Sequence, residues 1–279
     1  MFILIILSLD NKHIIPFLGY FTDYENIYIV MSYAHLGNLH SYIQQVENGM
    51  VSLERARLYL RQVTAALDYL SSARVAHRDI KLENVVLKSK DCLQLCDFGW
   101  AISYNEKTTK RSTLCGTPLY VPPEMLGSGR YDPSFVDAWA LGILAHEIIL
   151  DQSPFDLDDI EWDQCSNSSH APRRRILDKI KRFSVWTPPP LTATHAMAIN
   201  FIAALLKKDP AQRMTFPDAL CHPFLQDQEP MVRSRKVGAL DAPRLDCLGR
   251  TYETAKPDRD IFSMRLLKRP LSRRLQNKC

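Results

Sequence analysis

One long stretch of the chain carries hydrophobic residues at the spacing of an α-helix. From Leu53 to Leu70 they recur at intervals of three and four residues, which places them on a single helix face. Ser52 stands just before this stretch and is a residue type that caps helix N-termini. A second stretch, 136–150, is apolar almost all round and predicts a helix that is buried on every side.

Four shorter runs predict strands, and the first two of them are rich in β-branched and aromatic residues. The first two, 14–21 and 27–31, are separated by a polar turn, and the next two, 85–87 and 93–96, are separated by another. Each pair therefore predicts a hairpin. A polar break at 32–37 follows the first pair.

The first residues, Phe2–Leu7, form a short apolar run. This run lacks the basic residues that precede the core of a signal peptide, and it is too short to span a bilayer. We expect the end of a buried helix here and no membrane attachment. A signal or anchor segment is the alternative.

The charge of the chain is divided unevenly. The net charge is +4, but from Glu229 onward thirteen Lys/Arg and six Asp/Glu give +7, and residues 1–228 carry 22 against 25, a net −3. Only residues 228–279, which lack hydrophobic periodicity and predict a disordered tail, could attract nucleic acid weakly through charge. The seven scattered cysteines favour reduced thiols, and hence the cytoplasm or the nucleus.

The strongest chemical signal is the stretch His77-Arg78-Asp79-Ile80-Lys81-Leu82-Glu83-Asn84, followed by Asp97-Phe98-Gly99. Each acid alone could be an ordinary loop residue, but the spaced set matches the motifs of phosphoryl transfer. Transfer needs a carboxylate facing the attacking hydroxyl (Asp79), oxygen ligands for Mg²⁺ (Asn84 and Asp97), and a cation near the moving phosphoryl group (Lys81).

By these motifs the chain resembles the eukaryotic protein kinases. The resemblance implies an α+β, mainly α fold with a complete helical C-lobe, and the use of ATP and Mg²⁺. A lysine at position 81 is typical of serine/threonine kinases. The residues that the resemblance places around the nucleotide are Met31, Ser32, Ala34, Lys81, Glu83, Asn84, Val86 and Asp97.

The break after Met31 then corresponds to the kinase hinge, with the backbone of Ser32 and Ala34 facing the adenine. A hairpin followed by a plain loop is the alternative. The resemblance also assigns scaffold roles. Asp137 would hold the backbone of the catalytic loop, and Glu124 would pair with Arg213.

The segment from Trp100 to Pro123 corresponds to an activation segment. Thr113 is the expected phosphosite, with Arg78 as the partner of its phosphate. A solvated loop threonine is the alternative. Thr117 is expected to bond both Asp79 and Lys81, beside the protein substrate.

Three features resemble the Aurora kinases in particular: Asp97-Phe98-Gly99-Trp100, Arg111–Thr117, and Pro122-Pro123-Glu124. Leu82 departs from the pattern, because the family usually has proline there. Membership implies protein substrates, regulatory protein activators, and a place at the spindle, centrosome or chromosomes. Glu83 and Glu147 match positions where related kinases attract a basic residue just before the target Ser or Thr.

No candidate exists in the printed sequence for the Gly-rich loop, the strand lysine or the helix glutamate of a complete N-lobe. We therefore expect an incomplete N-lobe over residues 1–33, a C-lobe over 34–227 and the tail over 228–279. The chain is expected to be an N-terminally truncated form of a kinase. The alternative is a catalytically weak or inactive kinase-like module that works by binding, and a nucleic-acid binder that acts through the basic tail is a third candidate.

Overall fold

The structure is a computed structural model that describes residues 2–45, 49, 51–105, 110–155, 171–189 and 195–226. The helices of this part are α1 (Phe2–Leu7), α2 (Leu39–Gln45), α3 (Leu53–Ser72), α4 (Val136–Leu150), α5 (Ala171–Arg182), α6 (Ala196–Leu205) and α7 (Phe216–Cys221). The strands are β1 (Phe17–Thr22), β2 (Ile27–Met31), β3 (Val75–Ala76), β4 (Val85–Ser89), β5 (Cys92–Leu95) and β6 (Ile102–Ser103). The predicted tail lies outside the described residues.

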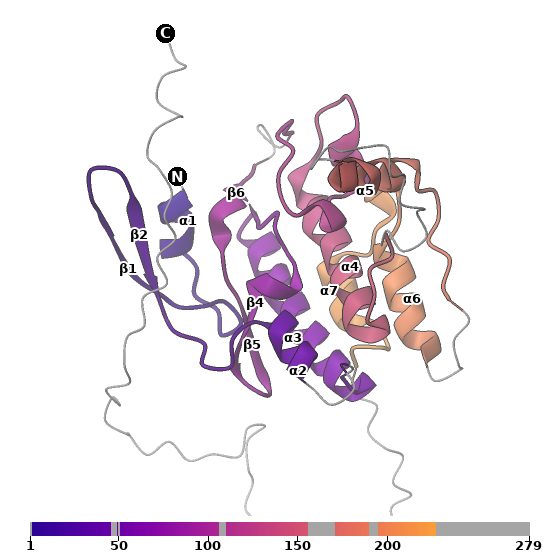
Figure 1. Ribbon diagram of the computed structural model, residues 1–279, viewed down its shortest axis with the longest axis horizontal. Helices are drawn as coiled ribbons and strands as arrows, with labels where there is room; N and C mark the ends of the chain where they lie inside the picture. The colour runs from indigo at the N-terminus through magenta and orange to yellow at the C-terminus, as the bar shows by residue number, and fades with distance from the viewer. Residues whose placement is uncertain are drawn as a thin grey trace, which may run out of the picture.

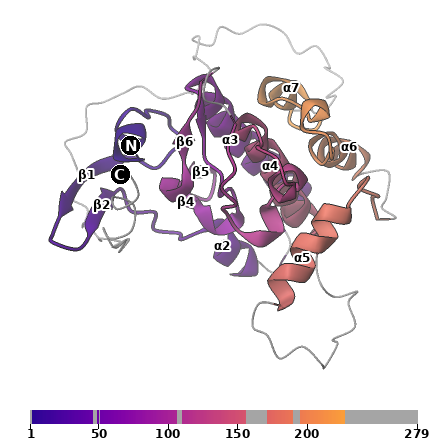
Figure 2. The ribbon, with the colours of Figure 1, turned by 90° about the horizontal axis from the view of Figure 1, so that it is seen from above.

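The elements fall into a small β part and a larger helical part. The hairpin of β1 and β2 stands with α1 at one side of the molecule, and α5 and α6 lie at the other side, beyond α4 (Figures 1 and 2). Strands pair as β1 with β2, β4 with β5, and β3 with β6, each pair antiparallel. The predicted α+β, mainly α fold is confirmed.

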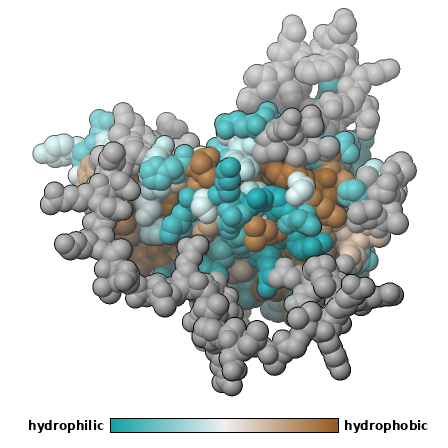
Figure 3. Space-filling model, turned by 90° about the horizontal axis from the view of Figure 1, so that it is seen from below, coloured by the Kyte–Doolittle hydropathy of each residue, from teal (hydrophilic) through white to brown (hydrophobic). Residues whose placement is uncertain are grey.

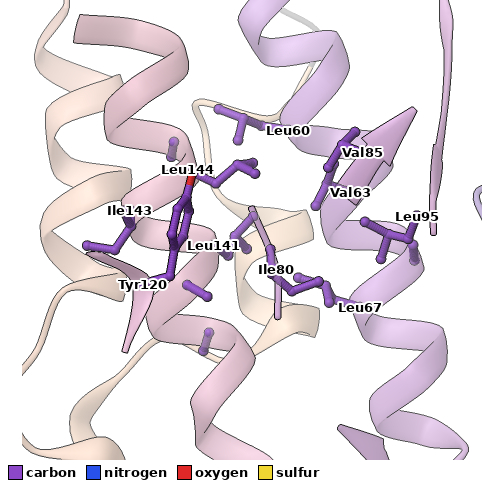
Figure 4. Packing of buried hydrophobic residues seen from close by; sticks show 14 of the residues in the cluster. Leu60, Val63, Leu67, Ile80, Val85, Leu95, Tyr120, Leu141, Ile143 and Leu144 are labelled. Atoms are coloured by element: carbon purple, nitrogen blue, oxygen red, sulfur yellow. The ribbon is translucent and has the colours of Figure 1, made fainter. Parts of the chain in front are cut away.

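Helices α3 and α4 form the centre of the core. The hydroxyl of Ser52 accepts a hydrogen bond from the Arg55 N–H at 3.2 Å, so the predicted N-cap of α3 is confirmed. Helix α4 has the bounds that its uniform apolar composition predicts. Figure 4 shows Ile80 of the catalytic loop between Leu67 of α3 and Leu141 of α4.

One segment of the described chain, Pro133–Leu150, has the length and apolar composition of a membrane span. Within the structure 72% of this segment is buried, as expected for the core helix α4. At the surface, hydrophobic residues lie beside hydrophilic ones on the face seen from below (Figure 3).

The first predicted strand is shorter than expected. Strand β1 starts at Phe17, because the two residues before Pro16 pair with β5 instead of β2. The Ile15 N–H donates to the Leu95 carbonyl at 2.9 Å, and Ile14 forms a bridge with Leu95. Proline has no N–H to continue a ladder, so the chain changes partners at this point.

The ends of the next hairpin also differ from the prediction. Strand β4 continues to Ser89, and β5 runs from Cys92 to Leu95, so Cys96 lies just outside it. In the sequence, an acidic stretch and the run Arg173-Arg174-Arg175 predict a surface loop over residues 156–175, but 171–175 belong to α5. The rest of that expected loop lies outside the described residues.

Helix α1 covers the apolar run at the start of the sequence. Ile5 and Ile6 are buried in the main core, and Leu7 is exposed. The expected buried helix end is therefore found here.

A buried ion pair ties the loop before α4 to the segment before α7. Both terminal nitrogens of Arg213 donate to the Glu124 carboxylate at 2.6 Å. The Arg213 guanidinium lies 5.1 Å from the centre of the Trp139 ring and also donates to the carbonyls of Lys207 and Phe135. Every part of this guanidinium is thus compensated in the interior.

We predict that Arg213→Ala lowers the free energy of unfolding by about 3–5 kcal/mol, because it leaves the Glu124 carboxylate without its cation. Adding Glu124→Gln should recover part of the loss. Urea denaturation measures both. Arg174→Ala is the control, because Arg174 is exposed and lies 4.0 Å from Asp178, and its loss should cost less than ~0.5 kcal/mol. Equal losses for the two arginines would contradict the prediction.

Candidate active site

The predicted catalytic loop, residues 77–84, is held in place by one buried carboxylate. Asp137 opens α4 and accepts the backbone N–H of His77 at 2.7 Å and that of Arg78 at 2.8 Å. Burial raises the pKa of the Asp137 carboxyl, and the two backbone donors oppose that rise. Because most residues of α4 are buried, Asp137 ties the loop to the core of the fold.

The side chain of His77 joins the loop to the segment of Asp97. Its Nε2 lies 3.0 Å from the Cys96 carbonyl, and its Nδ1 accepts the Asp79 N–H at 3.3 Å. A carbonyl can only accept, so one neutral tautomer, protonated at Nε2, serves both bonds. The ring also packs against Phe98 with a centroid distance of 4.7 Å. The two halves of the site are therefore held in register by one imidazole.

The residues predicted to act in catalysis meet at Asp79. The Asn84 amide nitrogen donates to the Asp79 carboxylate at 3.0 Å and to its carbonyl at 2.7 Å. The Lys81 ammonium lies 3.4 Å from Oδ2, the same carboxylate oxygen that accepts from Asn84. Thr117 donates to Asp79 Oδ1 through its N–H at 3.1 Å and its hydroxyl at 3.0 Å, and this hydroxyl accepts from Lys81 at 2.9 Å. Asp79 is thus a carboxylate held in a single orientation.

Asp97 is brought to this cluster by the β4–β5 hairpin. Val85 pairs with Leu95, and the Cys96 N–H donates to the Asn84 carbonyl at 2.9 Å, so Asn84 and Asp97 lie at the same end of the hairpin. The Asp97 backbone is left-handed, with φ of 55°, and its carboxylate accepts the Gly99 N–H at 3.1 Å. A strained backbone of this kind is common at functional sites.

The donor set at this end of the hairpin fits a hard cation. The nitrogen of the Asn84 amide donates hydrogen bonds to Asp79, so the amide oxygen is the atom that could bind a cation. Asp97 supplies a carboxylate as a second oxygen ligand. Oxygen ligands of this type suit Mg²⁺, which takes its other ligands from phosphate and water. No cluster of three His, Cys, Asp or Glu able to hold a metal exists among the described residues.

The residues predicted to face an adenine lie on the hairpin side of the molecule. Met31 and Ala34 pack against a small buried cluster that contains Val86, Ile15 and Cys96. The Ser32 N–H donates to the Pro16 carbonyl at 2.9 Å, so its N–H is directed away from any ligand. The structure therefore brings Met31, Ala34 and Val86 together on one apolar floor.

The predicted phosphosite is exposed, and its backbone is linked to the catalytic loop. The Thr113 carbonyl accepts the Tyr131 hydroxyl at 2.8 Å, and that hydroxyl accepts from Arg78 at 3.1 Å. Arg78 also donates to the Trp100 carbonyl at 2.9 Å. Cys115 lies in the same cluster, where burial raises the pKa of its thiol. The side chain of Tyr131 therefore links Arg78 to the Thr113 carbonyl through two hydrogen bonds.

The two predicted substrate acids lie in different settings. Glu83 is exposed beside the catalytic loop, whereas Glu147 accepts the hydroxyl of Tyr120. The same Tyr120 hydroxyl accepts the Leu82 N–H at 3.4 Å, a donor that a proline at this position would not have. Burial and Glu147 raise the pKa of Tyr120. The sequence after Thr117, Pro118-Leu119-Tyr120-Val121, fits the general Thr-Pro-x-Tyr pattern of kinases, but it assigned Tyr120 no role, and the structure shows that this hydroxyl joins Leu82 to Glu147.

Comparison with known proteins gives one family. A profile described as Protein kinase domain matches residues 3–225. The chain is 34% identical over 218 residues to an Aurora kinase of Encephalitozoon cuniculi, covering 78% of this chain and 74% of that protein. It is 35% identical over 214 residues to an Aurora kinase of Debaryomyces hansenii, covering 76% and 47%, and 34% identical over 240 residues to Aurora kinase B of Drosophila melanogaster, covering 85% and 67%. The chain therefore spans less than half of one of these relatives.

We predict that Gly116→Ala disrupts the site locally. Gly116 has φ of +89°, and a Cβ there would lie 2.8 Å from the Arg78 carbonyl oxygen. Gly37→Ala is the control, because Gly37 has φ of +73° but open space around it. The control should cost about 1 kcal/mol in urea denaturation, from the left-handed backbone alone. Gly116→Ala should cost at least twice as much, and equal costs would contradict the close approach.

Proposed function

The chain belongs to the protein kinase domain family and, within it, to the Aurora kinases, and from this premise we propose that it transfers the γ-phosphoryl group of ATP to serine or threonine hydroxyls of proteins. The observation that carries the proposal is the arrangement of Lys81, Asn84 and Thr117 around the carboxylate of Asp79. In the transfer, the substrate oxygen forms a bond to the γ-phosphorus, the bond to the ADP oxygen breaks, and the hydroxyl proton passes to Asp79.

The fixed orientation of Asp79 supports its role as the base. Its Oδ1 is held by two donors from Thr117, and its Oδ2 lies near the Asn84 amide and the Lys81 ammonium. Only 7% of Asp79 is exposed, so its carboxylate is largely withdrawn from bulk solvent. A preorganised carboxylate of this kind needs little rearrangement when a hydroxyl arrives.

Lys81 supports the transfer from the side of the phosphate. Its ammonium is 2.9 Å from the Thr117 hydroxyl, and its side chain is partly exposed, so it borders the space next to Asp79. A cation there offsets negative charge that develops on the moving phosphoryl group. Asn84 and Asp97 would hold Mg²⁺, which neutralises phosphate charge when it is bound.

The nucleotide is proposed to lie against the floor formed by Met31, Ala34 and Val86. The side chains there are apolar and suit the flat face of an adenine. The Ser32 carbonyl and the Ala34 N–H would recognise the adenine edge. The Ser32 N–H is already bonded to Pro16, which leaves its carbonyl for this role.

The preferred protein substrates are proposed to carry a basic residue just before the target Ser or Thr. Glu83 is exposed beside Lys81, and Glu147 is held by Tyr120 on the side of α4. Two carboxylates near the peptide site would attract an arginine. The chain's own sequence Lys110-Arg111-Ser112-Thr113 has this form, so Thr113 is proposed as a self-phosphorylation site.

A second candidate function is a kinase-like binding module with little or no turnover. It is favoured by one observation: residues 1–33 contain no Gly-rich loop and no lysine–glutamate pair of a complete N-lobe. Loss of one phosphate-positioning charge commonly costs 10²–10³ in rate, so a chain that acts with residues 1–33 alone as its N-lobe is expected to turn over slowly at most. Binding of Mg-ATP and transfer of phosphate separate the two functions.

We predict that Asp79→Asn lowers phosphoryl transfer to a basic Ser/Thr peptide by about 10²–10⁴-fold, because an amide cannot accept the proton. A radiolabel assay measures the transfer, and a Mg-ATP thermal shift checks that the nucleotide still binds. Asp91→Asn is the control, because Asp91 lies in the exposed β4–β5 turn. If the unaltered chain shows neither transfer nor a Mg-ATP shift, the binding module is supported instead.

We predict that Thr113→Ala removes the main self-labelling site and lowers transfer on the order of tenfold, a barrier change of about 1.4 kcal/mol. The phosphate would otherwise add a doubly charged partner near Arg78. Ser112→Ala is the matched control, because Ser112 is the exposed neighbouring hydroxyl. Mass-spectrometric mapping of the labelled chain measures the site. Unchanged labelling and rate in Thr113→Ala would refute the assignment.

A further inference from the structure

A groove of about 960 Å³ lies between α5 and the end of α4, apart from the residues of the proposed active site. Among the described residues its walls include Phe155, Arg175, Lys179, Arg182, Phe183 and Trp186. Figure 2 shows α5 at the outer edge of the molecule, beside α4. The sequence analysis predicted no site here.

One face of α5 forms a wall of the groove. Arg175, Asp178, Lys179 and Arg182 stand at positions i, i+3, i+4 and i+7, which lie on the same side of a helix. This face carries three cations and one acid. Another side of the helix holds Ile180, which is fully buried, so the orientation of the helix is fixed by the core.

The groove also has an apolar, aromatic side. Phe183 packs edge-on against Phe155 at 5.3 Å between ring centres, and Trp186 packs edge-on against His146 at 5.6 Å. Val185, between Phe183 and Trp186, is 74% exposed. A ligand in the groove would therefore meet both cations and hydrophobic side chains.

The groove adjoins the proposed peptide site. His146 lines the groove, and the next residue of α4, Glu147, accepts the Tyr120 hydroxyl. Helix α5 also packs against the turn Pro118–Tyr120, which directly follows Thr117. A chain bound in the groove would thus continue toward the residues that are proposed to hold the target Ser or Thr.

We propose that this groove docks an acidic segment with a central apolar side chain in the protein substrates of this kinase. The cations of the α5 face match acidic residues, and the wall of Phe183, Val185 and Trp186 matches an apolar anchor. Nucleic acid is the less suitable occupant, because Asp178 interrupts the cationic face and hydrophobic side chains also line the groove. That the docked segment belongs to a protein substrate rests on the proposed function, whereas the binding of an acidic segment does not.

The test is fluorescence anisotropy with a labelled peptide of Asp and Glu residues around a central Phe–Leu pair. Arg182→Glu should weaken binding about fivefold or more, because it reverses a charge on the groove wall. Lys181→Glu is the matched control. Lys181 is the exposed preceding residue and does not line the groove, so the same charge change should weaken binding less than twofold. Replacing the Phe–Leu pair of the probe by Ser–Ser should also weaken binding.

Three results would overturn the proposal: no binding of the acidic probe, equal losses in Arg182→Glu and Lys181→Glu, or displacement of the probe by a short DNA duplex that shows the same sensitivity to Arg182→Glu. Asp79→Asn should bind the probe as the unaltered chain does. If the unaltered chain binds the probe but transfers no phosphoryl group, the proposed function is overturned and the docking groove is kept. If it transfers phosphoryl groups but does not bind the probe, the docking groove is overturned and the proposed function is kept.

Discussion

Everything in the site depends on the two hydrogen bonds that Asp137 accepts from His77 and Arg78. Arg78 has a left-handed backbone, with φ of 65°, so the loop adopts a conformation that a free chain would rarely hold. A buried carboxylate with two backbone donors compensates for that strain. Without the Asp137 carboxylate, the core would no longer fix the orientation of Asp79. The contacts of Asp79 with Lys81 and Thr117 would then no longer be held in place.

The helices that the sequence predicted well are those whose hydrophobic pattern is compatible with only one secondary structure. Helix α3 has a regular apolar face and a serine cap, and α4 is apolar on every side, so both were predicted close to their observed bounds. Strand β1 was predicted too long, because the exchange of partners at Pro16 depends on β5, which is far away in sequence. Residues 171–175 were predicted as loop, because their charges hide the apolar side of α5 that only the core reveals.

The site was predictable where chemistry is written in adjacent residues. The spacing of Asp79, Lys81 and Asn84 already requires them to lie on one loop, and the hairpin after Asn84 returns the chain to Asp97. The sequence could not show that Tyr120 joins the Leu82 backbone to Glu147, because three separate segments meet there. It could not show the groove either, because residues 175–186 line it only where they pack against Phe155 and His146, which are distant in sequence.

Consecutive residues of α4, His146 and Glu147, serve two separate surfaces. Successive side chains of a helix point about 100° apart around its axis, and the packing of α4 prevents it from turning on its own. The separation of the two surfaces is thus as constant as the helix itself. If one protein binds both the proposed groove and the proposed peptide site, its two recognition segments must lie at a matching distance, and the length of chain between them then limits which proteins can bind both.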